Sequence, residues 1–312
     1  MELTLEQIKS VTFGALHVFQ DEQGYHFRRF TERQVDVLYA DRPQAGKDYD
    51  TTGIQLDFHT DATQVNLHVA AEGKYEILVD DLTAYCEQAN GPAHIFLPLG
   101  SGDKRITIIL PSHTEGILEK IVLDNAAYTK PHKHAMKLAF YGDSITQGWK
   151  SEKDSQSYAW LTTRFFDADS MIFGVGGTTF IPELPEDIGF RADTVIVALG
   201  TNDYGRDKSM SQIRSDCTAY LKKISSLYPD SKLFYIAPIW RRIGTTVKTA
   251  GTLADVRETV ADIANQLGYT VIDGLKLVPH RLEYYADNGT HPNDLGFAIY
   301  ALNLIKFLES HL

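Results

Sequence analysis

The chain has 312 residues and a formal net charge of −11, with 41 acidic and 30 basic residues. Nucleic acids and anionic membranes attract basic surfaces, and no dense cluster of Lys and Arg occurs, so both are disfavoured as partners. The length exceeds that of a usual single domain and indicates two domains, each able to bury a core. Cys86 and Cys217 lie far apart, and no His, Cys and carboxylate cluster has metal-ligand spacing. We therefore expect no disulfide, no metal and no other cofactor.

The first part of the chain alternates apolar and polar residues with a period of two, which is typical of half-buried strands. Turn signals such as Gly-Pro and Ser-Gly-Asp separate the runs. Many short strands of this kind predict an all-β sandwich over residues 1–130. The predicted strands cover residues 53–59, 64–69, 75–79, 93–97, 105–110 and 117–123.

After the polar stretch at 129–134 the pattern changes, because continuous apolar strands now alternate with helical patterns. This alternation predicts an α/β domain over residues 131–312, a flavodoxin-like, doubly wound parallel sheet. Functional residues in such sheets gather beyond the carboxyl ends of the strands. The predicted strands are 138–141, 170–173, 194–199, 232–238 and 270–272, and the predicted helices are 157–166, 210–228, 253–267 and 292–312.

The N-terminal residues show no basic segment followed by an apolar core, as a secretory signal would, and no later segment resembles a membrane span. We therefore predict a cytoplasmic protein.

Four motifs in the second half stand out by their chain order. They are Gly142-Asp-Ser-Ile-Thr-Gln-Gly148, Gly174-Val-Gly-Gly177, Gly200-Thr-Asn-Asp203 and Asp287-Asn-Gly-Thr-His-Pro-Asn-Asp294, of which the first three follow predicted strands. The order Ser144, Gly177, Asn202, His291 resembles that of the SGNH or GDSL hydrolases, a family of serine esterases and acylhydrolases. The resemblance covers roughly residues 135–312. By pattern more than by motif, the first half resembles the jelly-roll domain that precedes the hydrolase domain in family 2 carbohydrate acetyl esterases.

The resemblance implies that Ser144 is the nucleophile and that His291 is its base, since a serine hydroxyl becomes reactive only when a base removes its proton. It also implies that the backbone N–H groups of Ser144 and Gly177 and the amide of Asn202 stabilise the oxyanion. Taken alone, each residue has a structural interpretation: Ser144 as a helix cap, the glycines as a tight turn and Asn202 as an Asx-turn.

The residue that orients His291 departs from the family pattern. Relatives usually carry an aspartate three residues before the histidine, where this chain has Asn288. We favour Asp287 as the acid, which requires the turn to bulge. The alternative is a dyad in which Asn288 or a backbone oxygen holds the imidazole, and an amide would not stabilise imidazolium by charge. Asp273, at a predicted strand end, is a third candidate.

Aromatic and basic residues follow these motifs, namely Trp149, Tyr204, Arg206, Trp240 and Arg241. Aromatic faces suit a sugar ring, and we predict Trp149, Tyr204 and Trp240 as substrate contacts, although packing at the rim explains any one of them equally well. No long apolar segment suggests a lid for lipid. These features predict a serine esterase that removes acetyl or other short acyl groups from carbohydrate esters through an acyl-enzyme. The alternatives are a thioesterase, lysophospholipase or transacylase of the same fold, or a non-catalytic carbohydrate-binding protein.

Overall fold

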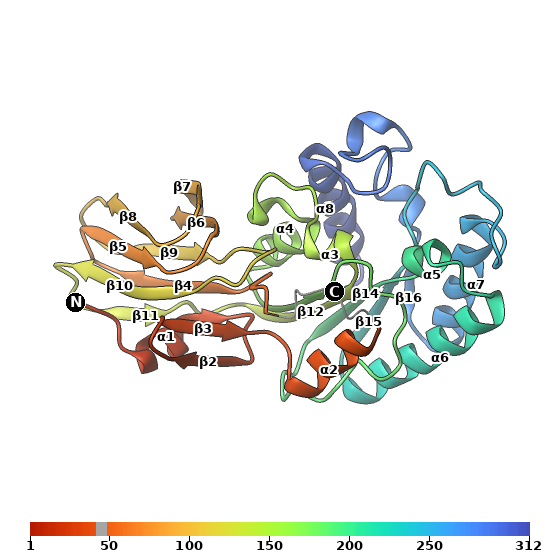
Figure 1. Cartoon of the computed structure of the whole chain (residues 1–312), viewed down its shortest axis with the longest axis horizontal. Helices are drawn as coiled ribbons and strands as arrows, with labels where there is room; N and C mark the ends of the chain where they lie inside the picture. The colour runs from red at the N-terminus through yellow and green to blue at the C-terminus, as the bar shows by residue number, and fades with distance from the viewer. Residues whose placement is uncertain (42–48) are drawn as a thin grey trace. The chain divides into compact units, whose positions relative to one another are not determined.

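The computed structural model describes residues 1–41 and 49–312, which form two compact units (Figure 1). The sandwich unit comprises Met1–Val35, the described part of Arg42–His134, and Lys153–Ser155. The sheet unit comprises Asp36–Asp41, Ala135–Glu152 and Gln156–Leu312.

The sandwich unit consists of two antiparallel sheets, so the predicted all-β sandwich is confirmed. Its buried core joins alternate residues of both sheets, among them Leu56 and Phe58 of one and Val65 and Leu67 of the other. One sheet has the order β1 (Thr12–Phe13), β4 (Gln55–Thr60), β9 (Lys104–Ile109), β6 (Gly73–Val79) and β7 (Leu82–Ala89), with β11 (Thr129–Pro131) paired to β4. The other has the order β2 (His17–Gln20), β3 (Tyr25–Arg28), β10 (Leu118–Asp124), β5 (Gln64–Val69) and β8 (Ala93–Pro98).

Two helices in the first part of the chain were not predicted, α1 (Leu5–Val11) and α2 (Glu32–Asp41). Both begin with the same capping pattern. The Thr4 hydroxyl accepts a hydrogen bond from the Gln7 N–H while the Gln7 side chain accepts from the Thr4 N–H. Thr31 and Gln34 repeat this exchange. The Thr-x-x-Gln spacing is a sequence signal for a helix start and would have revealed both helices.

The sheet unit contains five parallel strands in the order β13 (Ala168–Gly174), β12 (Met136–Gly142), β14 (Thr194–Ala198), β15 (Lys232–Ile236) and β16 (Thr270–Ile272). Counted along the chain this is 2-1-3-4-5, the flavodoxin-like order, so the predicted doubly wound sheet is confirmed. The strand order reverses at β12. Such a switch point opens a crevice at the carboxyl end of the strand, and the chain reaches Ser144 there.

Helices cover both faces of this sheet (Figure 1). Leu138 and Phe140 of β12 share one core with buried residues of α4 (Tyr158–Phe165) and α8 (Asp294–Glu309). Tyr141, the next residue, points to the other face, where its hydroxyl lies 2.9 Å from that of Tyr228 at the end of α6 (Met210–Leu227). On that face α6 packs against α7 (Leu253–Gln266). The strands of this sheet are buried on both faces, which explains why their sequences are continuous apolar runs.

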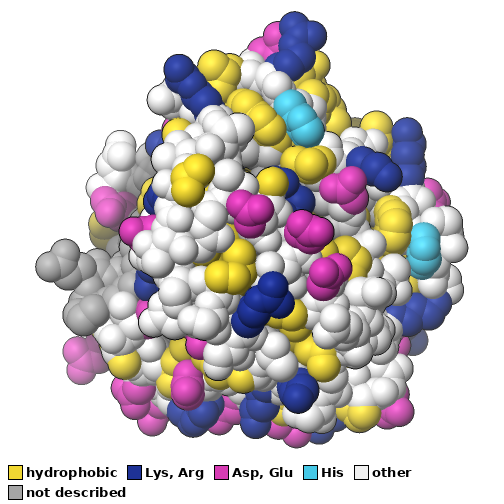
Figure 2. Space-filling view, turned by 90° about the vertical axis from the view of Figure 1, so that its right-hand side faces the viewer, with side chains coloured by type: hydrophobic (Ala, Val, Ile, Leu, Met, Phe, Trp, Pro, Cys, Tyr) yellow, Lys and Arg dark blue, Asp and Glu magenta, His cyan; other side chains and the backbone are white. Residues whose placement is uncertain are grey.

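None of the helices within residues 1–41 and 49–312 is long and apolar enough to cross a membrane. Cys86 and Cys217 are both free thiols. On the face shown in Figure 2, Lys and Arg side chains are scattered among acidic and apolar ones, and the described residues there form no basic patch.

In the sandwich unit the buried Glu76 and the half-buried Asp154 lie close enough for their charges to interact. The Glu76 carboxylate accepts hydrogen bonds from the N–H and the hydroxyl of Ser155, at 2.9 and 2.6 Å, and Asp154 accepts one from the Ser112 N–H at 3.0 Å. Burial raises the pKa of Asp154 to about 7, the hydrogen bonds from Ser112 oppose this rise, and the neighbouring Glu76 charge adds to it. Between about pH 4 and pH 7 the folded protein therefore holds a proton on Asp154 that the unfolded chain releases.

This proton makes stability depend on pH. A raised pKa in the folded state means that the stabilisation is present below about pH 4, where a free aspartate titrates, and is lost as pH rises towards 7. We predict that Asp154→Asn, which keeps an acceptor for the Ser112 N–H, removes this loss. Urea unfolding at pH 4, 5, 6 and 7 should show a stability difference between variant and wild type that shifts in favour of the variant as pH rises. Parallel curves would contradict the prediction.

Candidate active site

The loop that follows β12 presents the Ser144 side chain. The N-cap of the one-turn helix α3 (Ser144–Gln147) is Asp143, whose Oδ1 accepts from the Ile145 N–H at 2.9 Å. Ser144 is the first helical residue, so its hydroxyl is not used in the cap. The interpretation of Ser144 as a helix cap is therefore wrong.

Ser144, His291 and Asp287 form a continuous hydrogen-bonded relay. Ser144 Oγ lies 2.8 Å from His291 Nε2, and His291 Nδ1 lies 2.5 Å from Asp287 Oδ2. The other carboxylate oxygen, Oδ1, accepts from the His291 backbone N–H at 2.7 Å. Asp287 thus holds both the ring and the backbone of His291, in the geometry by which a carboxylate fixes the tautomer and orientation of a general base.

The relay also determines the charge of Asp287. Burial raises the pKa of this carboxyl, but hydrogen bonds from the His291 side chain and backbone outweigh burial, so the pKa of Asp287 is lowered overall. Asp287 is consequently ionised at neutral pH, as a partner for an imidazolium must be.

The other two candidates for the acid lie elsewhere. Asn288 adopts a left-handed backbone conformation (φ 53°), and its side-chain oxygen accepts from the Arg242 guanidinium. Asp273 caps the short 3₁₀ helix Gly274–Lys276 by accepting from the Leu275 N–H at 3.0 Å. Of the three residues, all within the described chain, the structure brings Asp287 to His291.

The loop after β13 carries Gly177 and is fixed by Gln147, which the sequence analysis missed. Gln147 Oε1 accepts from the Gly176 N–H and from the Trp149 indole N–H, each at 2.8 Å. Gly174 is required because a Cβ there would collide with the Gln147 backbone. Gly177 has φ 76°, its carbonyl accepts from Arg206 at 2.7 Å, and no acceptor for its N–H lies among the described residues.

Asn202 lies on α5 (Thr201–Gly205), directly after β14. Its amide nitrogen donates to Asp143 Oδ2 at 3.3 Å and to the Thr178 carbonyl at 3.1 Å. An Asx-turn at Asn202 would use the Tyr204 N–H, which instead donates to the Gly200 carbonyl at 3.2 Å, so the Asx-turn interpretation of Asn202 is wrong. The structure therefore places Asn202 beside the residue that precedes Ser144.

The three predicted substrate contacts differ in their surroundings. Trp149 is half-buried, and its ring centroid lies 6.3 Å from that of His291. Trp240 packs against Tyr285, at 5.1 Å between centroids. Tyr204 is 0% exposed, with its hydroxyl 2.8 Å from the carbonyl oxygens of Ile243 and Thr246. Because Tyr204 offers no exposed face, it cannot stack on a sugar ring, and the prediction of Tyr204 as a substrate contact is wrong.

The sandwich unit contains a histidine cluster that the sequence analysis did not predict. The His134 side chain is 5% exposed, although it lies in the polar stretch at 129–134, and the ligand atoms of His132, His134 and Asp57 lie within 4.8 Å of one another. Arg105 already donates to both oxygens of Asp57, at 2.9 and 2.6 Å. A neutralised carboxylate is a poor ligand for a cation, so we assign no metal to this cluster.

Comparison with known families identifies the sheet unit. The profile of the GDSL-like lipase/acylhydrolase family matches residues 140–299, a segment that contains Ser144, Gly177, Asn202 and His291. The chain belongs to this family. The resemblance predicted from the four motifs is confirmed.

Solved structures with the same fold span both units. The salicylyl-acyltransferase SsfX3 from a tetracycline biosynthetic pathway has 19% identity and a TM-score of 0.83, covering 96% of this chain and 94% of its own. The acetyl xylan esterase Est2A from the rumen bacterium Butyrivibrio proteoclasticus has 13% identity and a TM-score of 0.70, covering 100% and 98%. A family two carbohydrate esterase from Clostridium thermocellum, in complex with cellohexaose, has 18% identity and a TM-score of 0.67, covering 84% and 93%.

A comparison with curated protein sequences gives no match. The solved structures named above have 13 to 19% identity with this chain, so the likeness to them concerns the fold. Together with membership of the GDSL-like family, it supports an esterase or acyltransferase activity for this GDSL hydrolase.

The position of Asp287 generates a prediction about the acid. We predict that Asp287→Asn lowers kcat for an aryl acetate by several powers of ten, about 10⁴-fold for a relay carboxylate, because an amide cannot stabilise imidazolium by charge. Asn288→Ala is the matched control and should cost less than about tenfold, or 1.4 kcal/mol. Steady-state kinetics and melting temperatures would be measured for both. A mild Asp287→Asn effect beside a severe Asn288→Ala effect would show that the dyad alternative is correct.

Proposed function

We propose that the protein is a serine esterase that removes short acyl groups, most simply acetyl, from carbohydrate esters through an acyl-enzyme. One observation carries this proposal: the relay from Ser144 Oγ to His291 Nε2 (2.8 Å) and from His291 Nδ1 to Asp287 (2.5 Å). It supplies a nucleophile, a base in contact with it and a charged group that orients the base.

The relay can perform both halves of acyl transfer. His291 Nε2 takes the proton of Ser144 as Oγ attacks the ester carbonyl, and Asp287 stabilises the imidazolium that forms. Collapse of the tetrahedral intermediate breaks the bond to the sugar oxygen, which leaves as an alcohol with the proton from His291. A water molecule then attacks the acyl-Ser144 ester, again with His291 as base, and releases the acid.

Three hydrogen-bond donors serve the oxyanion in this proposal. The N–H of Ser144, as the first residue of a helix, has no intrahelical acceptor, and the Gly177 N–H has none among the described residues. The Asn202 amide is the third donor, and the oxyanion would take one of its two hydrogens in place of the Thr178 carbonyl. Donors fixed before the reaction stabilise the developing charge, and loss of one typically costs about 3 to 4 kcal/mol.

The carbohydrate part of the proposal depends on Trp149 and on the related structures. Trp149 is held beside His291 by its hydrogen bond to Gln147, and an indole face can stack on a sugar ring. Trp240 is a second predicted contact, on the loop after β15. Esterases of the same fold include one named for acetyl xylan and one solved with cellohexaose, which supports a carbohydrate ester as substrate.

Acyl transfer to an alcohol other than water is the second candidate function. The structural likeness to the salicylyl-acyltransferase favours it, since that likeness has a TM-score of 0.83 over nearly the whole chain. The acyl-enzyme would form in the same way, and the acceptor hydroxyl would take the place of water. A thioesterase or lysophospholipase would instead differ in acyl length.

The nucleophile is tested by Ser144→Ala. We predict that this variant keeps its melting temperature and loses nearly all turnover of an aryl acetate, because oxyanion donors cannot replace a nucleophile. Asn202→Ala, tested in parallel, should lower kcat by about 10² to 10³. Turnover by Ser144→Ala at the wild-type rate, with an unchanged melting curve, would overturn the assignment. Inertness of the wild-type protein towards a fluorophosphonate probe would favour the non-catalytic binding protein.

Acyl specificity is tested with a series of aryl esters and with acetylated oligosaccharides. We predict that kcat/KM falls from acetate to butyrate and is small for octanoate, and that oligosaccharides release acetate. A maximum at octanoate would favour the lysophospholipase or thioesterase alternative. Acetate release that is replaced by a transfer product on addition of an alcohol acceptor would favour the acyltransferase.

A further inference from the structure

The carboxylate of Asp143 joins two loops that carry proposed oxyanion donors. Oδ1 accepts from the Ile145 N–H at 2.9 Å and so fixes the first turn of α3, where the Ser144 N–H lies. Oδ2 accepts from the Asn202 amide at 3.3 Å, on the loop after the neighbouring strand β14. One rigid group thus spans two strand ends, and its two oxygens set the separation between the Ser144 N–H and the Asn202 amide.

Two acceptors, Asp143 and the Thr178 carbonyl, together fix the orientation of the Asn202 side-chain amide. In the free protein the amide nitrogen donates one hydrogen to the Thr178 carbonyl at 3.1 Å and the other to Asp143. An oxyanion would take the place of the Thr178 carbonyl, while Asp143 keeps the second hydrogen. Both acceptors require the nitrogen, and not the oxygen, to face them. The side-chain amide of Asn202 is therefore held with its donors towards the Ser144 loop, and an amide flipped by half a turn would place its oxygen against a carboxylate.

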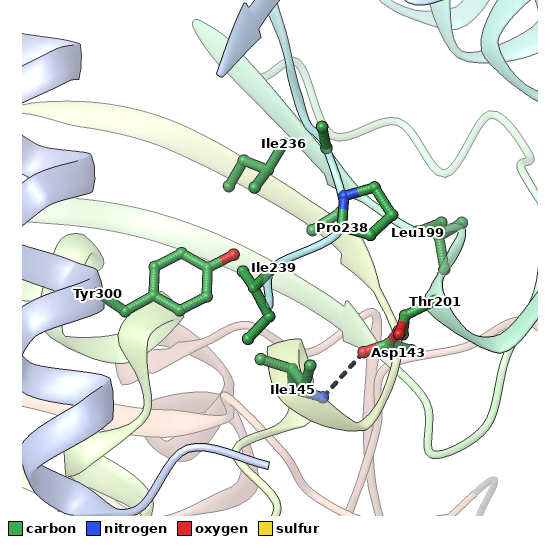
Figure 3. Close-up of a pocket in the computed structure, with 10 residues that line it drawn as sticks. Asp143, Ile145, Leu199, Thr201, Ile236, Pro238, Ile239 and Tyr300 are labelled. Atoms are coloured by element: carbon green, nitrogen blue, oxygen red, sulfur yellow. Dashed lines mark hydrogen bonds between the residues drawn. The ribbon is translucent and has the colours of Figure 1, made fainter. Parts of the chain in front are cut away.

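The surroundings of Asp143 make its charge costly. The side chain is 2% exposed and borders a cavity of about 20 Å³ lined by apolar side chains such as Ile236 and Ile239, with Thr201 and Tyr300 as polar members (Figure 3). Burial raises the pKa of Asp143 to about 6, and the Ile145 N–H and the charges of His291 and Arg241 oppose this rise.

A helix cap alone would not need this charge. Serine or asparagine would cap α3 as well as aspartate does, without burying a charged group. The ionised carboxylate therefore has a use beyond the cap.

We propose that Asp143 is a positioning residue, whose carboxylate holds the Asn202 amide and the first turn of α3 in the geometry that the oxyanion requires. The proposal rests on the proposed function, since it presumes that Asn202 donates to an oxyanion. It assigns no direct contact between Asp143 and the substrate.

Asp143→Asn tests the charge without removing the cap. The new amide can accept from the Ile145 N–H through its oxygen, but its nitrogen then faces the Asn202 nitrogen, and two donors without an acceptor repel. We expect kcat for an aryl acetate to fall about 10- to 100-fold, less than the loss of the donor itself, with KM changed by less than about threefold. If Asp143→Asn does not fold, Asp143→Ser, which retains a cap, takes its place.

A double-mutant cycle shows whether Asp143 acts through Asn202. In the Asn202→Ala background, Asp143→Asn should lower kcat by less than about threefold, because the group that it positions is gone. An equal factor in both backgrounds would overturn the proposal and indicate that the charge acts on His291 instead. An unchanged kcat in the wild-type background would overturn it as well.

Two controls separate this proposal from its alternatives. Asp273→Asn changes an aspartate that also caps a short helix after a strand, through the Leu275 N–H, and should leave kcat within about twofold. Ser144→Ala and Asn202→Ala, measured in the same assay, test the proposed function itself. If both abolish or lower turnover while Asp143→Asn does not, the positioning role fails and the esterase function stands.

Discussion

The structure depends on the imidazole of His291 being held between a hydroxyl and a carboxylate that come from distant parts of the chain. Ser144 is 147 positions away in sequence, whereas Asp287 is four positions away and binds both the ring and the backbone of His291. Ser144 lies in the loop after β12, where the strand order of the parallel sheet reverses. The carboxylate is delivered by a turn in which Asn288 and Gly289 both adopt positive φ, at 53° and 90°.

The parallel sheet explains why residues scattered over the sequence meet. Neighbouring strands β13, β12 and β14 end at one edge, so the loops that follow them bring Gly177, Ser144 and Asn202 together. These loops are then tied to one another by side chains within them. Gln147 links the α3 turn to the Gly176 N–H, and Asp143 links it to Asn202. We therefore expect a substitution of Gln147 or Asp143 to change the geometry of the site, although neither side chain would touch a substrate.

The doubly wound sheet and the family could be predicted from the sequence. The apolar runs of the strands and the order of the four motifs can both be read directly along the chain. It did not determine the acid. Asp287 meets His291 in a turn where Asn288 adopts a left-handed conformation and its side chain binds Arg242, and residue spacing alone does not reveal such a turn. The burial of Tyr204 could not be predicted either, since its hydroxyl donates to the carbonyls of Ile243 and Thr246, which lie far along the chain. Helices α1 and α2 were not predicted, although the Thr-x-x-Gln spacing that caps each of them is present in the sequence.

The central claim is that catalysis proceeds through an ester on Ser144. The most direct measurement is mass spectrometry of the wild-type protein, quenched in acid during turnover of an aryl acetate and digested before analysis. The account predicts one added acetyl group, on the peptide that contains Ser144, which disappears when the substrate is exhausted. Steady turnover without any acetylated peptide, or with the acetyl group on another residue, would contradict it.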